Sequence, residues 1–306
     1  MSAGWVSGSV RGRLLASRRL GLAGAREVAA SGGAAAGVAR LAASPYGRDV
    51  RSGMAPDAAR RGIGTVALWH LRVLAGWLPP RAGDVVRVFG ARFELANVAD
   101  RLAALEGFPV PPPYELGALA VAWPLVAGAA DAGEVRRALA VSPWGDPGSA
   151  EWPPAALALE ARWTSWLAGA VPGAAEWAAG AAAIVAARRL VAGPAAGPAG
   201  LADLRRQLGR AWEGATSLGD LAARLPRAAA WALDGVDEAA DLWRAEGRWW
   251  ARVDRDAAGT LRAGRPGPAV AGAAAARLAA DAWRARAALE AASWGPEGLE
   301  AFDAVA

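Results

Sequence analysis

Residues 41–47 read Leu-Ala-Ala-Ser-Pro-Tyr-Gly, and residues 139–145 read Leu-Ala-Val-Ser-Pro-Trp-Gly. The two stretches lie 98 positions apart, and five of their seven residues are identical. Proline fixes φ and glycine tolerates positive φ, so each stretch predicts a turn that follows the end of a helix. The match therefore indicates an internal repeat, a helical unit of roughly a hundred residues. A degraded third copy is expected at residues 218–226.

The sequence on either side of these turns favours helix throughout. Alanine, the best helix former, is the commonest residue, whereas Ile occurs twice and Thr four times in 306 residues. The 38 Gly and 20 Pro fall mostly between apolar-periodic segments. We therefore expect an all-α fold with helices over residues 5–22, 23–41 with a break at 31–33, 54–77, 83–105, 116–130 with a kink at Pro124, 133–139, 153–170, 174–191, 201–212, 218–225, 237–263 and 270–293.

Several kinds of chemistry are excluded by residues that the chain lacks. It has no Cys, which excludes disulfides, zinc ribbons and thiol catalysis. All 34 basic residues are Arg, so no lysine is present for a P-loop or a Schiff base. His70 is the only histidine, and we expect it to be a core or boundary residue. We expect no metal, no cofactor and no catalytic residue.

Three other patterns have ordinary explanations that outweigh functional ones. Residues 62–67 fit a loose GxGxxA pattern, but the preceding segment is charged and helical rather than a strand, which disfavours dinucleotide binding. The acidic groups at 237–241 and 297–300 are typical of a solvated helix face. The 16 Trp residues supply core volume; we expect this of Trp69, Trp77, Trp123, Trp231, Trp243 and Trp250.

Charge and hydropathy argue against nucleic acid and against a membrane span. The net charge is +5, and 29 acidic residues are interspersed with the basic ones. The apolar runs at 117–130 and 166–187 are short or interrupted by proline, and the N-terminal segment lacks the apolar block of a signal peptide. We expect a cytoplasmic protein that binds no nucleic acid.

Four stretches resemble the C subunit of V/A-type rotary ATPases, which is subunit d in the eukaryotic enzyme. They are the opening Trp5–Leu15, the helix end Leu41–Gly47 with Tyr46, the helix start Phe93–Leu102 with Phe93 and Asn97, and Asp281–Arg286 in the last helix. Trp144 occupies the position of Tyr46 in the second turn. The likeness extends over nearly the whole chain, although its third part, residues 174–225, lacks the Asn and most of the polar marks.

The resemblance implies an architecture and a role. The fold would be three similar helical units in a pseudo-threefold funnel, at residues 5–92, 93–175 and 176–278, followed by a closing helix at 279–306. Such a subunit hydrolyses nothing; it lies peripherally on the cytoplasmic face of the membrane. There it couples the central-stalk subunit to the proteolipid ring for proton or sodium transport. No enzymatic activity is expected of the chain itself.

One partner interface can be suggested from the sequence. The N-terminal segment carries Arg11, Arg13, Arg18 and Arg19, and such cations would favour the loops of the ring and nearby anionic lipid headgroups. A solvated helix face is the competing interpretation of each Arg. The competing functions are a free-standing helical adaptor that binds protein partners and an Arg/Trp-based nucleic-acid binder.

Overall fold

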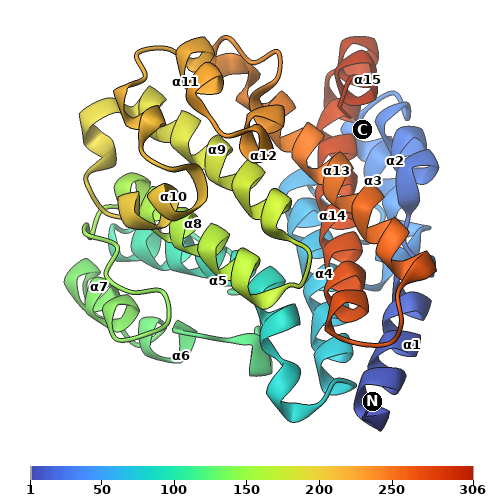
Figure 1. The fold of residues 1–306 in the computed structure, drawn as a ribbon. Helices are drawn as coiled ribbons and strands as arrows, with labels where there is room; N and C mark the ends of the chain where they lie inside the picture. Colours follow the sequence, from blue (N-terminus) through green and yellow to red (C-terminus); the bar gives the residue numbers. More distant parts are fainter. Residues whose placement is uncertain (1, 306) are drawn as a thin grey trace. The chain divides into compact units, whose positions relative to one another are not determined.

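A computed structural model describes residues 2–305, apart from the side chains of residues 81 and 194. Within this range the chain forms α-helices and short 3-10 turns and contains no strand (Figure 1). The prediction of an all-α fold is confirmed. Alanine-rich sequence with few β-branched residues explains why helices form everywhere that Gly and Pro permit.

The chain divides into two compact units. Unit 1 combines the chain up to Phe89 with the chain from Trp250 onward, and unit 2 is Gly90–Trp249. The boundaries fall inside two long helices, α5 (Asp84–Leu105) and α13 (Leu242–Ala263). The three-unit division suggested by the resemblance stays a prediction.

Unit 1 is built around one central helix, α14, which packs against the N-terminal helices (Figure 1). Residues 270–276 of α14 are all buried, and most are Ala. Small side chains allow close approach: a Cβ on Gly12 would lie 2.8 Å from the Cβ of Ala274. The helices wholly within this unit are α1 (Ala3–Ser17), α2 (Gly21–Ala29), α3 (Ala34–Ala42), α4 (Pro56–Gly76), α14 (Pro268–Ser293) and α15 (Gly295–Asp303), with 3-10 turns η1 (Pro45–Arg48) and η2 (Pro80–Ala82).

Unit 2 contains a second Ala-rich buried helix, α9, in which residues 177–187 are all buried. Its neighbours include α8, α10 and α12. The helices wholly within this unit are α6 (Trp123–Val126), α7 (Ala132–Ala140), α8 (Trp152–Ala170), α9 (Ala175–Ala192), α10 (Leu201–Leu208), α11 (Leu218–Arg224) and α12 (Arg227–Ala230), with 3-10 turns η3 (Gly117–Leu119), η4 (Gly193–Ala196), η5 (Ala211–Gly214), η6 (Trp231–Leu233) and η7 (Ala239–Asp241).

Tryptophans fill the volume that the alanines of unit 2 leave. Trp163 is buried, and its ring lies edge-on to that of Trp249 with centroids 6.0 Å apart. The indole N–H of Trp249 donates to the carbonyl of Trp177 at 2.7 Å, so its polar atom is satisfied in the core. Trp250 in unit 1 is also buried, as expected, but Trp77 and Trp243 are 50% and 41% exposed and were wrongly predicted to be core residues.

Four predicted helices are clearly shorter than expected. Those expected over 5–22 and 201–212 end at Ser17 and Leu208. Residues 116–130 form only η3 and the four-residue α6, because Pro124 occupies the first turn of α6 and starts that helix rather than kinking a longer one. The helix expected over 237–263 begins at Leu242, after the separate turn η7.

Candidate functional site

Glu94 is a buried acid that binds both a helix start and the second repeat turn. It lies on α5 and is fully buried. Its Oε1 accepts from the backbone N–H groups of Val121, Ala122 and Trp123 at 2.9, 2.7 and 2.5 Å. Its Oε2 accepts from the indole N–H of Trp144 at 2.9 Å. One carboxylate therefore satisfies the orphan donors at the start of α6 and fixes the tip of the turn.

Asp281 in unit 1 likewise binds a helix start and the first repeat turn. It lies on α14 and is 3% exposed. Its oxygens accept from the backbone N–H groups of Leu20 and Gly21, at the start of α2, at 3.0 and 2.8 Å. The phenol of Tyr46 donates to Asp281 at 2.8 Å. Burial, then the charge of Asp281 and the hydrogen bond to it, raise the pKa of Tyr46 well above its ordinary value.

The two repeat turns also have the same local hydrogen bonds. In each, the serine hydroxyl donates to the carbonyl three residues earlier at 2.7 Å and accepts from the backbone N–H of the aromatic residue two positions later. Backbone bonds from Gly47 to Ser44 and from Gly145 to Ser142 close both turns. Tyr46 and Trp144 therefore hold equivalent places, each aimed at a buried acid. We refer to the acid, the helix start and the aromatic turn together as the acid clamp.

Asn97 lies three residues after Glu94 on α5 and pins an extended segment. Its amide donates to the carbonyl of Tyr114 at 2.9 Å and accepts from the backbone N–H of Tyr114 at 2.7 Å. The rings of Phe93 and Tyr114 meet edge to face with centroids 5.1 Å apart. Both residues suggested by the resemblance thus hold the segment before α6.

The expected third copy is partial. Helix α11 begins as α7 does: Ser217 and Asp131 each accept from the N–H three residues later, and an acid in the first turn accepts in return from the N–H before the cap. The Ser-Pro-aromatic turn is not repeated in the sequence after α11, where Leu225 and Pro226 follow directly.

The four N-terminal arginines have different surroundings. Arg13 donates to the carbonyls of Leu261 and Gly264 at 3.0 and 2.7 Å and so caps the end of α13. Arg11 lies over the ring of Trp77, with the guanidinium 5.9 Å from its centroid. Arg19 is half-buried and donates to Ala16, whereas Arg18 is exposed. The four arginines therefore differ in their surroundings, and Arg18 is the exposed one.

The exposed face of α1 is instead apolar. Val6, Val10 and Leu14 recur every fourth residue and are 44%, 60% and 39% exposed. With Arg18 one turn further along, they form a surface that we call the α1 stripe. The sequence did not predict that this stripe is exposed, because the same residues also fit the buried face of an amphipathic helix.

His70 and the glycine-rich pattern are structural. Burial, followed by the charges of Arg48 and Arg11, lowers the pKa of His70 to about 4, so its ring is neutral at pH 7. Gly62 and Gly64 lie inside α4, where no strand-to-helix loop exists. A Cβ on Gly62 would lie 2.7 Å from the carbonyl oxygen of Asp49, which explains the glycine by close packing.

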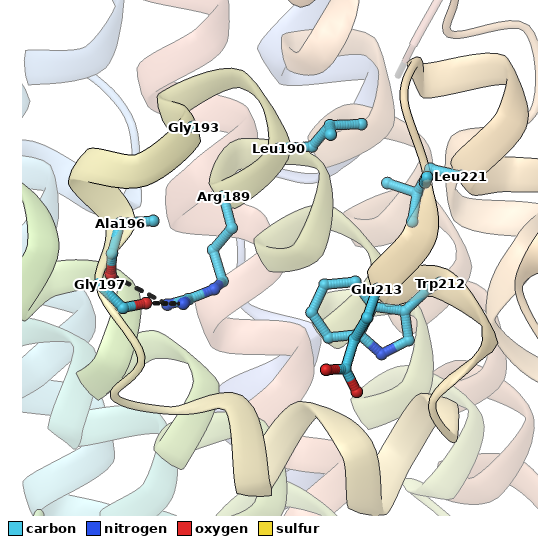
Figure 2. A pocket seen from close by; sticks show the side chains of 9 residues that line it. Arg189, Leu190, Gly193, Ala196, Gly197, Trp212, Glu213 and Leu221 are labelled. Atoms are coloured by element: carbon cyan, nitrogen blue, oxygen red, sulfur yellow. Dashed lines mark hydrogen bonds between the residues drawn. The ribbon is translucent and has the colours of Figure 1, made fainter.

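Small cavities occur in unit 2. One of about 270 Å³ is lined by Arg189, Trp212, Glu213 and apolar neighbours (Figure 2). Figure 2 shows the guanidinium of Arg189 directed to the carbonyls of Ala196 and Gly197, and it also reaches that of Ala199 at 2.9 Å. Glu213 pairs with Arg205 at 2.7 Å. The polar groups of this cavity are therefore already engaged by the protein.

The second cavity, of about 230 Å³, lies beside the second repeat turn and is lined by Trp144, Asp146, Arg162 and Asp203 among others. Arg162 donates to Asp203 at 3.4 Å and to the carbonyl of Pro143 at 3.3 Å. These contacts tie the turn to α8 and α10.

Within residues 2–305, no helix combines the length and the apolar character needed to cross a bilayer. In the same range, His, Asp and Glu side chains form no group of three placed to hold a metal ion. A scan against protein-family models and a search of curated proteins found no match to the chain.

Proposed function

We propose that this chain is a non-catalytic rotor subunit of a V/A-type ATPase, bound peripherally at the cytoplasmic face of the membrane. In that role it couples the central stalk to the proteolipid ring during proton or sodium transport. The observation that carries the proposal is the acid clamp, which occurs in both units with the same kinds of contact: a buried acid, a helix start and an aromatic turn. It supports a repeated, stiff helical body, which is what a torque-transmitting element requires.

The use of the buried acids also supports a role without chemistry. Glu94 and Asp281 are the most deeply buried carboxylates of the clamps, and each is engaged by three or four donors from the chain itself. A general acid or base needs a carboxyl group within reach of a substrate proton. The carboxylate oxygens of Glu94 and Asp281 instead accept hydrogen bonds that hold the fold together.

The second candidate is a free-standing helical adaptor, and the α1 stripe favours it. Three aliphatic side chains on one exposed helix face suit the docking of a partner helix. The rotor proposal uses the same face for a rotor partner. The two functions therefore differ in the identity of the partner rather than in the surface.

The test is co-purification of the tagged full chain with the central-stalk subunit and the proteolipid ring encoded in the same genome. We expect both to be retained, with weaker retention at high ionic strength because exposed charges are screened. Val10→Asp and Arg18→Glu should reduce retention, while Arg255→Glu, an exposed change on α13, should not.

Arg13→Glu is unsuitable as an interface variant because it removes the cap of α13. Failure to retain either rotor subunit, with both folded and present, would contradict the rotor proposal. Retention of a different protein that is lost in Val10→Asp would favour the adaptor.

A further inference from the structure

The clamp in unit 1 carries an arginine where the clamp in unit 2 carries an asparagine. Arg284 lies three residues after Asp281, as Asn97 lies three residues after Glu94. Both the amide nitrogen and the amide oxygen of Asn97 bond to the backbone of Tyr114. Arg284 is 4% exposed, and its Nη2 donates to Asp254 at 3.4 Å.

The remaining donors of Arg284 are buried without an acceptor. Neither its Nε nor its Nη1 has a hydrogen-bond partner among the described residues. The Nε of Arg19 is also buried and has no hydrogen-bond partner among the described residues. Leaving a buried charged donor unpaired is costly, and native proteins satisfy nearly all such groups. Three N–H groups of Arg284 and Arg19 therefore have no acceptor among the described residues.

The local charge balance points the same way. Arg19, Arg277 and Arg284 surround two carboxylates, Asp254 and Asp281. Arg277 donates to Asp254 at 2.7 Å, and the oxygens of Asp281 are taken by Leu20, Gly21 and Tyr46. In this cluster three guanidinium groups outnumber two carboxylates, and of the three arginines Arg284 is the buried one.

The pKa directions are consistent with this crowding of cations. Burial, followed by the charges of Arg277 and Arg284, lowers the pKa of Arg19 below its ordinary value. Burial opposes ionisation of Asp254, but the hydrogen bond from Arg277 and the nearby arginine charges bring its pKa below the usual value. The carboxylate of Asp254 therefore stays ionised at pH 7. Burial raises the pKa of Asp281, a shift that can only add to the positive excess.

We propose that unit 1 holds one small monovalent anion, of the halide class, bound by the free N–H groups of Arg284 and Arg19. The anion takes the place that the backbone of Tyr114 takes beside Asn97 in unit 2. It neutralises the excess charge and completes the hydrogen bonding around α14.

The test compares the thermal stability of the full chain in sodium chloride and in sodium gluconate at equal ionic strength. Gluconate is too large to enter a buried two-arginine site. Chloride should raise Tm saturably, by about 5 °C at a hundredfold excess over its Kd. Crystals grown with bromide should show an anomalous peak within hydrogen-bond distance of Arg284 and Arg19.

Arg284→Met removes the donors and should abolish the difference between the two salts. Arg26→Met, which changes an exposed arginine paired with Asp303, should preserve it. Equal Tm in both salts, or only a water molecule between the two arginines in bromide crystals, would overturn the proposal. The salt comparison and the anomalous peak need only the wild-type chain, so they decide the matter even if Arg284→Met does not fold.

Discussion

At the scale of single residues, Glu94 shows how much one buried carboxylate can organise. All four of its hydrogen bonds are accepted, three by Oε1 and one by Oε2. Both oxygens of Glu94 face N–H donors. In Glu94→Gln the new NH₂ group would therefore face a donor in either orientation of the amide. We expect a loss of about 2–3 kcal/mol of unfolding free energy, measured by urea titration. Glu106→Gln, at an exposed glutamate, should change stability by less than about 0.5 kcal/mol. Wild-type stability of Glu94→Gln would show that the clamp is dispensable.

The single histidine predicts a pH dependence. The pKa of His70 falls from 6.5 to about 4 in the folded chain, so below pH 6.5 the unfolded chain binds a proton that the folded chain does not. Stability should therefore decrease as the pH falls from 6.5 to 5, by up to about 1.4 kcal/mol per pH unit. Urea titrations at pH 7, 6 and 5 measure the decrease. His70→Gln should remove most of it, and an unchanged slope in that variant would assign the effect to other groups.

At the scale of elements, the sequence predicts helices α4, α5, α7 and α11 closely, whereas it misplaces the start of α13 and mispredicts the segment 116–130. Helices α4 and α5 begin and end within two residues of their expected bounds, because Pro79 and Pro80 interrupt the chain between them. The segment 116–130 was expected to be helical because it is apolar. Its backbone donors at 121–123 go to Glu94, 27 to 29 residues away, and periodicity contains no such information.

The candidate site was predicted only in outline. The matching turns identified Tyr46 and Trp144 as equivalent. They did not identify the acids that accept the hydrogen bonds of these two side chains. The available signal was a carboxylate directly between two apolar residues, as Glu94 lies between Phe93 and Leu95. The unsatisfied donors of Arg284 depend on three segments that meet only in the folded chain.

Replacing a glycine by alanine should lower the stability at a helix contact and raise it on an open helix face. A Cβ at Gly12 in α1 would lie 2.8 Å from Ala274, so Gly12→Ala must push α1 from α14 and should destabilise by about 1–3 kcal/mol. A Cβ at Gly259 in α13 meets nothing within 4 Å, so Gly259→Ala should stabilise by about 0.5–1 kcal/mol. Thermal unfolding of both variants gives the comparison; the same sign for both would contradict the contact argument.

At the scale of the whole molecule, the two acid clamps can be loosened one at a time. Tyr46→Phe removes one donor to Asp281, and Trp144→Phe removes one donor to Glu94. Each should cost about 1–2 kcal/mol. Hydrogen exchange should accelerate in α2, α3 and α14 for the first variant and in α5, α6 and α7 for the second. Acceleration spread equally over both units by either variant would show that the clamps do not act locally.

The placement of Asp281 late in the chain has a consequence for biosynthesis. Its partners Leu20, Gly21 and Tyr46 precede it by 261, 260 and 235 residues, whereas Glu94 precedes Trp144 by only 50. On the ribosome, unit 2 is complete while the N-terminal helices still lack α14. At 5–20 residues per second, Tyr46 waits roughly 10–50 s for its acceptor. During that interval the faces of α1, α2 and α4 that pack on α14 have no covering helix, so we expect the nascent chain to expose apolar surface until α14 emerges.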